Sequence, residues 1–185
     1  MTKAKAKKAD ERKAQELLIE VPLNGASVQV ANGTLTFSAN GKTFTKQYNQ
    51  KTLTISVQDG KVLIKGIGKA TRVKAAQAYS VKAHLRNMIQ GSATEFSKEM
   101  QIIFAHFPVT VEIKGKDIYI KNFLGEKQPR IAQIQGNAKV EVKGQTILIT
   151  GNDKEDVGQT ANNLRRATRI TNKDNRIFQD GIYYS

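Results

Sequence analysis

Two stretches of the chain carry the same order of hydrophobic and polar positions, 85 residues apart. Each stretch has two short runs in which apolar and polar residues alternate, then a glycine, then a segment with helical periodicity. The matched positions are Val57 and Val142, Val62 and Ile147, Leu63 and Leu148, Ile64 and Ile149, Gly66 and Gly151, and Ala76 and Ala161. Upstream the alternation continues at a shift of 83 residues, where Val28, Val30, Leu35 and Phe37 correspond to Val111, Ile113, Ile118 and Ile120. This self-similarity predicts a duplicated domain.

Turn residues divide the first copy into short strands. Asn32-Gly33 and Asn40-Gly41 each lie between alternating runs, and both residue types tolerate the positive φ of a type I′ turn. We therefore expect a three-stranded meander, followed by a second hairpin around Asp59-Gly60. Residues 71–89 are expected to form a helix that packs on the sheet. Its apolar stripe consists of Ala78, Val81, Leu85 and Met88.

The second copy predicts the same plan. Strands are expected around 109–113, 118–121, 139–142 and 146–149, and a helix over about 155–170 with Asp153 as a candidate N-cap. Asp180-Gly181 predicts one more turn before Ile182, and the polar segment 91–100 is expected to connect the two copies. The predicted fold class is α+β, with two tandem duplicated domains, each a mostly antiparallel β-sheet packed against one α-helix.

The predicted organisation has three parts. Residues 1–16 are rich in lysine, have no apolar periodicity and are expected to be a flexible basic arm. Residues 17–92 form the first α+β repeat. Residues 93–185 form the second repeat and end in a segment expected to contact nucleic acid.

The charge of the chain points to a polyanionic partner. Lys and Arg number 30 against 16 Asp and Glu, which gives a net charge of +14. The excess is concentrated in residues 1–92, which hold 16 basic and 5 acidic residues, whereas residues 93–185 hold 14 and 11. Such an uneven excess is typical of a surface that binds RNA or DNA.

Catalytic and metal-binding patterns are weak. The chain has no cysteine, and His84 and His106 lie in different halves with no ligand spacing to one another. The segment Gly66-Ile67-Gly68-Lys69-Ala70-Thr71 lacks the first glycine and the Ser or Thr that a phosphate-binding P-loop needs, although its glycines and Lys69 could still hold one phosphate. We therefore expect no catalytic residues, no metal and no cofactor. The N-terminus has no apolar h-region and no run is long enough to span a membrane, so neither secretion nor a membrane partner is expected.

Two basic helix faces are the candidate binding surfaces. In the first copy Arg72, Tyr79, Lys82 and Arg86 follow one another at spacings of seven, three and four, which places them on one face. Tyr79 could stack on a base or sugar. The candidate contacts to phosphate are Lys69, Arg72, Lys82 and Arg86 in the first copy, and Arg165, Arg166, Arg169, Lys173 and Arg176 in the second. A charged helix face can also be only the solvated side of the helix.

Four short motifs stand in a fixed order along the chain. They are Asn87-Met88-Ile89-Gln90-Gly91, Ala105-His106-Phe107-Pro108-Val109, Asn122-Phe123-Leu124-Gly125-Glu126 and Arg176-Ile177-Phe178-Gln179-Asp180-Gly181-Ile182-Tyr183. With these motifs the chain resembles the archaeal and eukaryotic type of large-subunit ribosomal protein six, over nearly everything after residue 16.

The resemblance implies a non-enzymatic, cytoplasmic component of the large ribosomal subunit. It further implies binding to large-subunit ribosomal RNA near the sarcin-ricin loop, next to other large-subunit proteins and close to where translational GTPases dock. It also suggests that residues 176–183 are an RNA contact, whereas the pattern alone makes Phe178 and Tyr183 core residues. The alternatives are a tandem nucleic-acid-binding module outside the ribosome, an enzyme that uses the loop at 66–71, and a scaffold for acidic proteins.

Overall fold

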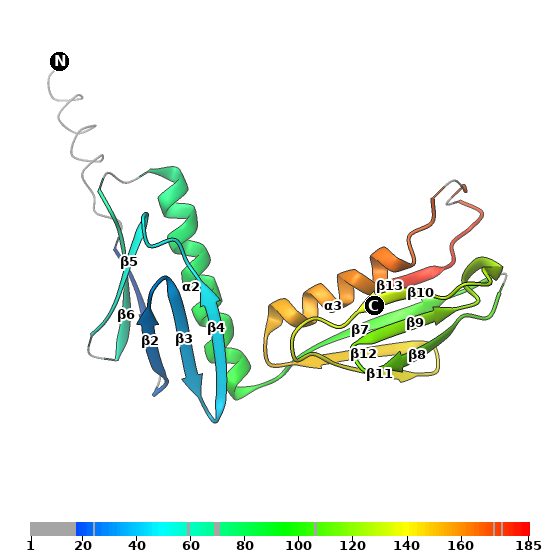
Figure 1. Cartoon of the computed structure of the whole chain (residues 1–185), viewed down its shortest axis with the longest axis horizontal. Helices are drawn as coiled ribbons and strands as arrows, with labels where there is room; N and C mark the ends of the chain where they lie inside the picture. The colour runs from blue at the N-terminus through cyan, green and yellow to red at the C-terminus, as the bar shows by residue number, and fades with distance from the viewer. Residues whose placement is uncertain are drawn as a thin grey trace, which may run out of the picture. The chain divides into compact units, whose positions relative to one another are not determined.

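The computed structural model describes residues 18–23, 25–58, 60–68, 71–105, 107–171, 173–174 and 176–185 (Figure 1). The expected arm at 1–16, Lys69 and His106 lie outside these residues. The chain divides into two compact units, of which the first ends at Ala93 and the second begins at Thr94. In the described chain no helix is both long enough and apolar enough to cross a membrane.

Within residues 18–93, as far as they are described, the first unit contains two antiparallel three-stranded sheets and one long helix. The sheet orders are β2-β3-β4 and β1-β6-β5, and the helix packs against both sheets around Phe37, Ile64 and Leu85. The elements are β1 (Leu18–Pro22), β2 (Ser27–Ala31), β3 (Thr34–Ala39), β4 (Lys42–Gln47), β5 (Leu53–Gln58), β6 (Lys61–Gly66) and α2 (Arg72–Ala93).

The second unit has the same plan with one strand added. Its sheets have the orders β10-β9-β8 and β11-β12-β7-β13, and its helix covers a core that includes Met100, Ile120 and Leu164. The elements are β7 (Phe96–Ile103), β8 (Thr110–Lys114), β9 (Asp117–Lys121), the short 3-10 helix η1 (Phe123–Gly125), β10 (Arg130–Gln133), β11 (Lys139–Lys143), β12 (Thr146–Gly151), α3 (Lys154–Ala167) and β13 (Gly181–Tyr184).

The two units confirm the predicted duplication and the α+β class. The order β1-β6-β5 in the first unit corresponds to β7-β12-β11 in the second, the two meanders correspond, and α2 corresponds to α3. The Asn-Gly turns are also as predicted, because φ is 45° and 76° at Asn32 and Gly33 and 52° and 73° at Asn40 and Gly41. β13 has no counterpart in the described first unit, so β1 lies at the edge of its sheet while β7 is covered by β13.

Two sequence-based expectations are wrong. The segment 91–100 is not a polar connector, because Gly91 and Ser92 are buried at the end of α2 and residues 96–103 form the sheet strand β7. Asp180-Gly181 is not a turn either. Gly181 opens β13 with the ring of Tyr183 over it, and a Cβ at Gly181 would lie 2.8 Å from that ring. The glycine is therefore required by the close ring and not by a turn.

Candidate nucleic-acid interface

The C-terminal end of α3 is a concentrated source of positive charge. The helix begins at the N-cap Asp153, whose carboxylate accepts a hydrogen bond from the Glu155 backbone N–H at 2.9 Å. Its first turn carries acidic residues, and its last turn carries Arg165 and Arg166. This order of charge complements the helix dipole, so the arginines stabilise the helix at the end where they are exposed.

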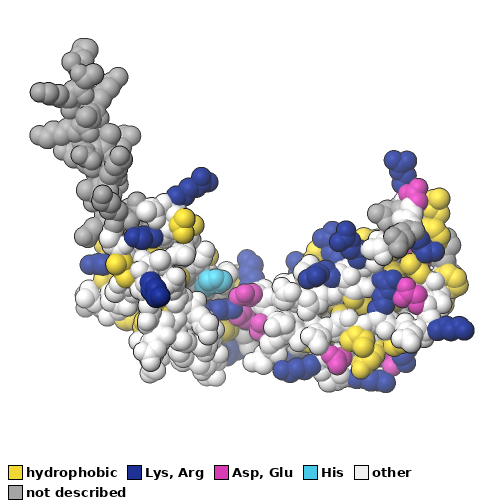
Figure 2. Space-filling view, turned by 45° about the horizontal axis from the view of Figure 1, so that its top comes forward, with side chains coloured by type: hydrophobic (Ala, Val, Ile, Leu, Met, Phe, Trp, Pro, Cys, Tyr) yellow, Lys and Arg dark blue, Asp and Glu magenta, His cyan; other side chains and the backbone are white. Residues whose placement is uncertain are grey.

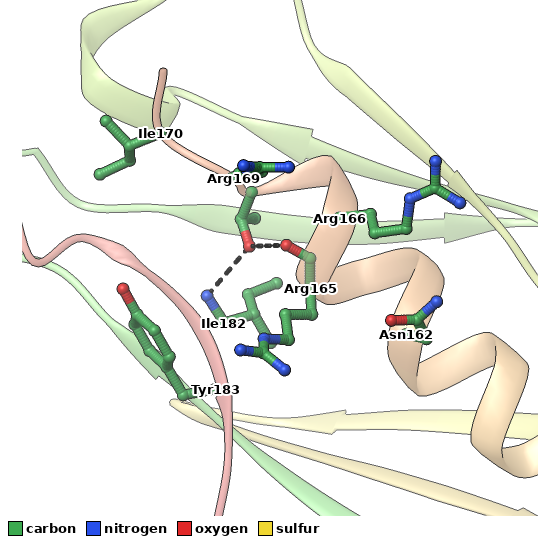
Figure 3. A pocket seen from close by; sticks show the side chains of 8 residues that line it. Asn162, Arg165, Arg166, Arg169, Ile170, Ile182 and Tyr183 are labelled. Carbon is green, nitrogen blue, oxygen red and sulfur yellow. Dashed lines mark hydrogen bonds between the residues drawn. The ribbon is translucent and has the colours of Figure 1, made fainter. Parts of the chain in front are cut away.

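An open hollow of about 620 Å³ lies at this end of α3 (Figure 3). Arg165, Arg166 and Arg169 fan out from the helix end around it, and Tyr183 of β13 stands across from them. In the described chain the residues that line the hollow include no acidic side chain. They are Asn162, Arg165, Arg166, Thr168, Arg169, Ile170, Ile182 and Tyr183.

β13 is attached to the helix end by the buried hydroxyl of Thr168. This hydroxyl accepts a hydrogen bond from the Ile182 backbone N–H at 3.1 Å and lies 3.2 and 3.3 Å from the carbonyl oxygens of Leu164 and Arg165. The buried Asp180 fixes the entry to the strand, since its carboxylate accepts a hydrogen bond from the Ala105 N–H at 2.8 Å. The two walls of the hollow are thereby joined.

Aromatic rings hold several of the cations near the hollow. The Tyr184 ring centroid lies 4.1 Å from Lys98 Nζ and 5.6 Å from Arg165 Cζ. Lys173 Nζ lies 4.4 Å from the ring centroid of Phe178, in the segment between α3 and β13. Contacts of this kind restrict long cationic side chains without neutralising their charge. Tyr183 is 41% exposed, so the expectation that it belongs to the core is wrong.

The predicted site residues of the second unit therefore fall into two groups. The hollow brings Arg165, Arg166 and Arg169 together. Lys173 and Arg176 lie on the connecting segment, both exposed, and do not line the hollow. The Arg176 backbone N–H is held by the Asp174 carboxylate at 2.9 Å.

In the first unit the predicted residues that the structure describes lie along α2. Arg72 and Arg86 are exposed and Lys82 is half-buried, with its Nζ 6.0 Å from the ring centroid of Tyr79, which is 57% exposed. His84 is half-buried beside Leu85 and Met88. On the face seen in Figure 2, dark-blue Lys and Arg side chains outnumber magenta Asp and Glu side chains.

Other cations are used within the fold. Lys121 Nζ lies 2.6 Å from the Glu112 carboxylate, and this hydrogen bond lowers the pKa of Glu112 below its usual value. Arg130, which the sequence reasoning missed, donates hydrogen bonds to Glu126 and to the end of α3. The spacing of four residues between Glu126 and Arg130 could have indicated their ion pair, but nothing in the sequence indicated the contact of Arg130 with the end of α3. In the described chain no group of three or more His, Asp or Glu side chains is placed to hold a metal ion.

A family model and individual relatives both assign the chain to the same family. Residues 107–181 match the family described as Ribosomal protein L6. The large ribosomal subunit protein uL6 of Methanosarcina mazei is 41% identical, over 89% of this chain and 93% of the relative. Those of Methanocella arvoryzae and Desulfurococcus amylolyticus are 39% and 40% identical, over 89% of this chain and 93% and 90% of the relatives. The resemblance carried by the four motifs is confirmed, and the chain belongs to the uL6 family of ribosomal proteins.

Proposed function

We propose that this protein is a non-catalytic structural component of the large ribosomal subunit that binds large-subunit ribosomal RNA. The observation that carries the proposal is the hollow at the end of α3, which gathers three exposed arginines in a unit that otherwise has nearly balanced charge. The names of the relatives, all large ribosomal subunit proteins, support the same partner.

The binding mechanism is the neutralisation of phosphates. Each arginine that pairs with a phosphate releases counterions from the RNA, so the affinity falls with salt by about 0.7 to 0.9 in log K per unit of log salt for each contact. Arginine suits this role because its planar guanidinium forms two parallel hydrogen bonds to one phosphate. Base-specific contacts are expected to be few, because duplex RNA presents mainly its backbone and shape to a protein.

The RNA target that we propose lies near the sarcin-ricin loop, next to the region where translational GTPases dock. The support for this finer position is the resemblance in the motifs at 87–91, 105–109, 122–126 and 176–183. One of these motifs lines the hollow, through Ile182 and Tyr183 of β13. The motif at 122–126 is linked to the same end of α3, because Glu126 pairs with Arg130, which donates a hydrogen bond to the Ala167 carbonyl. Neighbouring large-subunit proteins are the remaining expected partners.

Charge reversal of the hollow tests the proposal. The triple variant Arg165→Glu, Arg166→Glu, Arg169→Glu should bind a large-subunit RNA fragment containing the sarcin-ricin loop more weakly, with a flatter salt dependence. A control with the same change in net charge reverses three lysines that do not line the hollow, namely Lys116, Lys139 and Lys143. The control should retain most of the affinity and the slope.

Two results would contradict the proposal. Equal loss in both triple variants would mean that only net charge matters. Retained affinity in the arginine variant would remove the hollow from the binding surface. Co-sedimentation of the wild-type chain with large subunits after a high-salt wash separates a ribosomal component from a nucleic-acid-binding module that acts elsewhere.

A further inference from the structure

We propose that Arg130 is a positioning residue for RNA binding: it holds the backbone at the end of α3 so that Arg165, Arg166 and Arg169 point at the RNA, and it does not contact RNA itself. The proposal rests on the proposed function of the hollow. It assigns a role to a basic residue that neither lines the hollow nor belongs to a helix.

The hydrogen bonds of Arg130 leave it little capacity for an outside ligand. Its Nη1 donates to the carbonyl oxygens of Ala167 at 2.9 Å and Arg169 at 3.0 Å. Its Nε and Nη2 donate to the two carboxylate oxygens of Glu126 at 2.8 and 2.6 Å. A guanidinium has five N–H groups, so at most one is left for a phosphate.

The two carbonyl groups that Arg130 binds belong to the place where the helix stops. The last carbonyl groups of a helix have no partner within the helix, and a cation placed there satisfies them and opposes the dipole. Arg169 is just past the helix end, and its backbone N–H bonds to the Arg166 carbonyl at 3.2 Å. Because its N–H and its carbonyl are both hydrogen-bonded, the backbone of Arg169 is fixed, and so is the position of the Cα that carries its side chain.

The guanidinium of Arg130 also stacks on a buried aromatic ring. Its Cζ lies 4.4 Å from the ring centroid of Phe123, which is 1% exposed and part of the core of the second unit. A cation that is stacked on a buried ring and paired with a carboxylate has few alternative positions. The guanidinium therefore links the core to the helix end as a rigid spacer.

The turn that brings Phe123 and Glu126 to Arg130 has an uncommon backbone. Asn122 and Leu124 have φ of 58° and 52°, in the left-handed region that residues other than Gly and Asn rarely adopt. The Asn122 side-chain amide donates to the Pro108 carbonyl at 3.0 Å, which holds the turn at its start. A strained backbone persists where the surrounding contacts determine it, and here it places two partners on one guanidinium.

The variant Glu126→Gln separates a positioning role from a contact role by the sign of its effect. Removal of an acidic side chain normally strengthens the binding of a protein to RNA, since it removes repulsion from the phosphates. If Arg130 contacted phosphate, loss of its competing carboxylate would strengthen binding further. If Arg130 positions the helix end, Glu126→Gln loosens it and weakens binding.

The experiment measures binding of full-length variants to the RNA fragment with the sarcin-ricin loop over a range of salt. Arg130→Gln should weaken binding about tenfold while the salt slope stays at the wild-type value, because no phosphate contact is removed. Arg169→Gln should weaken binding and also lower the slope by about one contact. The control Lys127→Gln removes an exposed neighbouring charge and should leave affinity nearly unchanged. Glu126→Gln should weaken binding severalfold.

Hydrogen exchange on the free protein keeps this test separate from the proposed function. Residues 167–171 should exchange faster in Arg130→Gln and in Glu126→Gln than in the wild type, with the core strands unchanged. If the wild type fails to bind the RNA, the proposed function is wrong, while the exchange result still decides whether Arg130 holds the helix end. A slope lowered by one contact in Arg130→Gln, tighter binding by Glu126→Gln, or unchanged exchange at 167–171 would overturn the positioning role.

Discussion

Replacement of Thr168 by valine tests how the last strand is attached to α3. Valine has the shape of threonine, so the packing of the buried side chain, which is 4% exposed, is kept. The hydroxyl is lost, and with it the acceptor for the Ile182 N–H at 3.1 Å. The Leu164 carbonyl still accepts the Thr168 backbone N–H at 3.2 Å, so the main loss falls on Ile182 and on the Arg165 carbonyl.

The expected cost is about 2 kcal/mol, since a buried donor left without a partner costs about 1 to 3 kcal/mol. For a unit of this size, about 1 kcal/mol corresponds to about 4 to 8 °C in Tm, so Thr168→Val should lower the Tm of the second unit by about 8 to 16 °C. Thr168→Ser is the matched variant, because it keeps the hydroxyl and removes one methyl group. It should cost about 0.8 kcal/mol.

Calorimetry of the full chain measures the Tm of the second unit in each variant. Hydrogen exchange shows which backbone amides lose protection. In Thr168→Val the amide of Ile182 should lose protection, whereas in Thr168→Ser it should stay protected. If the valine variant is as stable as the serine variant, or if Ile182 stays protected in it, then the Thr168 hydroxyl does not hold β13.

Three further predictions concern stability. Gly158 lies inside α3 with open space where a Cβ would be, so Gly158→Ala should raise the free energy of unfolding by about 0.5 to 1 kcal/mol. Gly151→Ala should instead destabilise the protein, because its Cβ would lie 2.9 Å from the buried Val157 side chain; thermal melts of both variants check this contrast. The hydrogen bond from Arg130 lowers the pKa of Glu126 below its usual value, so its contribution to stability is present at neutral pH and is lost as the pH falls below about 4.5. Urea unfolding of the wild type and Glu126→Gln should therefore differ at pH 7 and converge at acid pH, and a difference that grows toward acid pH would contradict this.

Local chemistry was sufficient to predict the duplication and the first meander. Asn-Gly pairs specify tight turns through positive φ, and alternating residues specify which strand face is buried, so neither needs distant information. β7 was missed because its first half, Phe96-Ser97-Lys98-Glu99, is mostly polar, and because the strand is defined by its partners. Those partners are β12 and β13, which lie far along the sequence. Asp180-Gly181 misled because the same dipeptide is typical of turns.

The candidate site was predictable only in its helical part. The spacing of Arg165, Arg166 and Arg169 predicted that they share one helix end, and the structure places them together; their contact with RNA stays a prediction. The opposite wall of the hollow comes from β13, and Arg130 reaches the helix end from a distant strand. Both depend on tertiary packing, which a single sequence does not reveal.

In the part of the chain that the structure describes, the second unit has one strand more than the first, and this difference creates a problem of partner choice during folding. β1 and β7 are corresponding strands, yet β13 must pair with β7 and must not pair with β1. Tandem copies of one fold are prone to assemble with the wrong copy, and an open sheet edge invites such pairing. β1 ends in Pro22, which has no backbone N–H to offer an incoming strand, and carries the charged Glu20. Pro22 and Glu20 therefore disfavour pairing of β13 with β1, so β13 pairs with β7 in the sheet of its own unit.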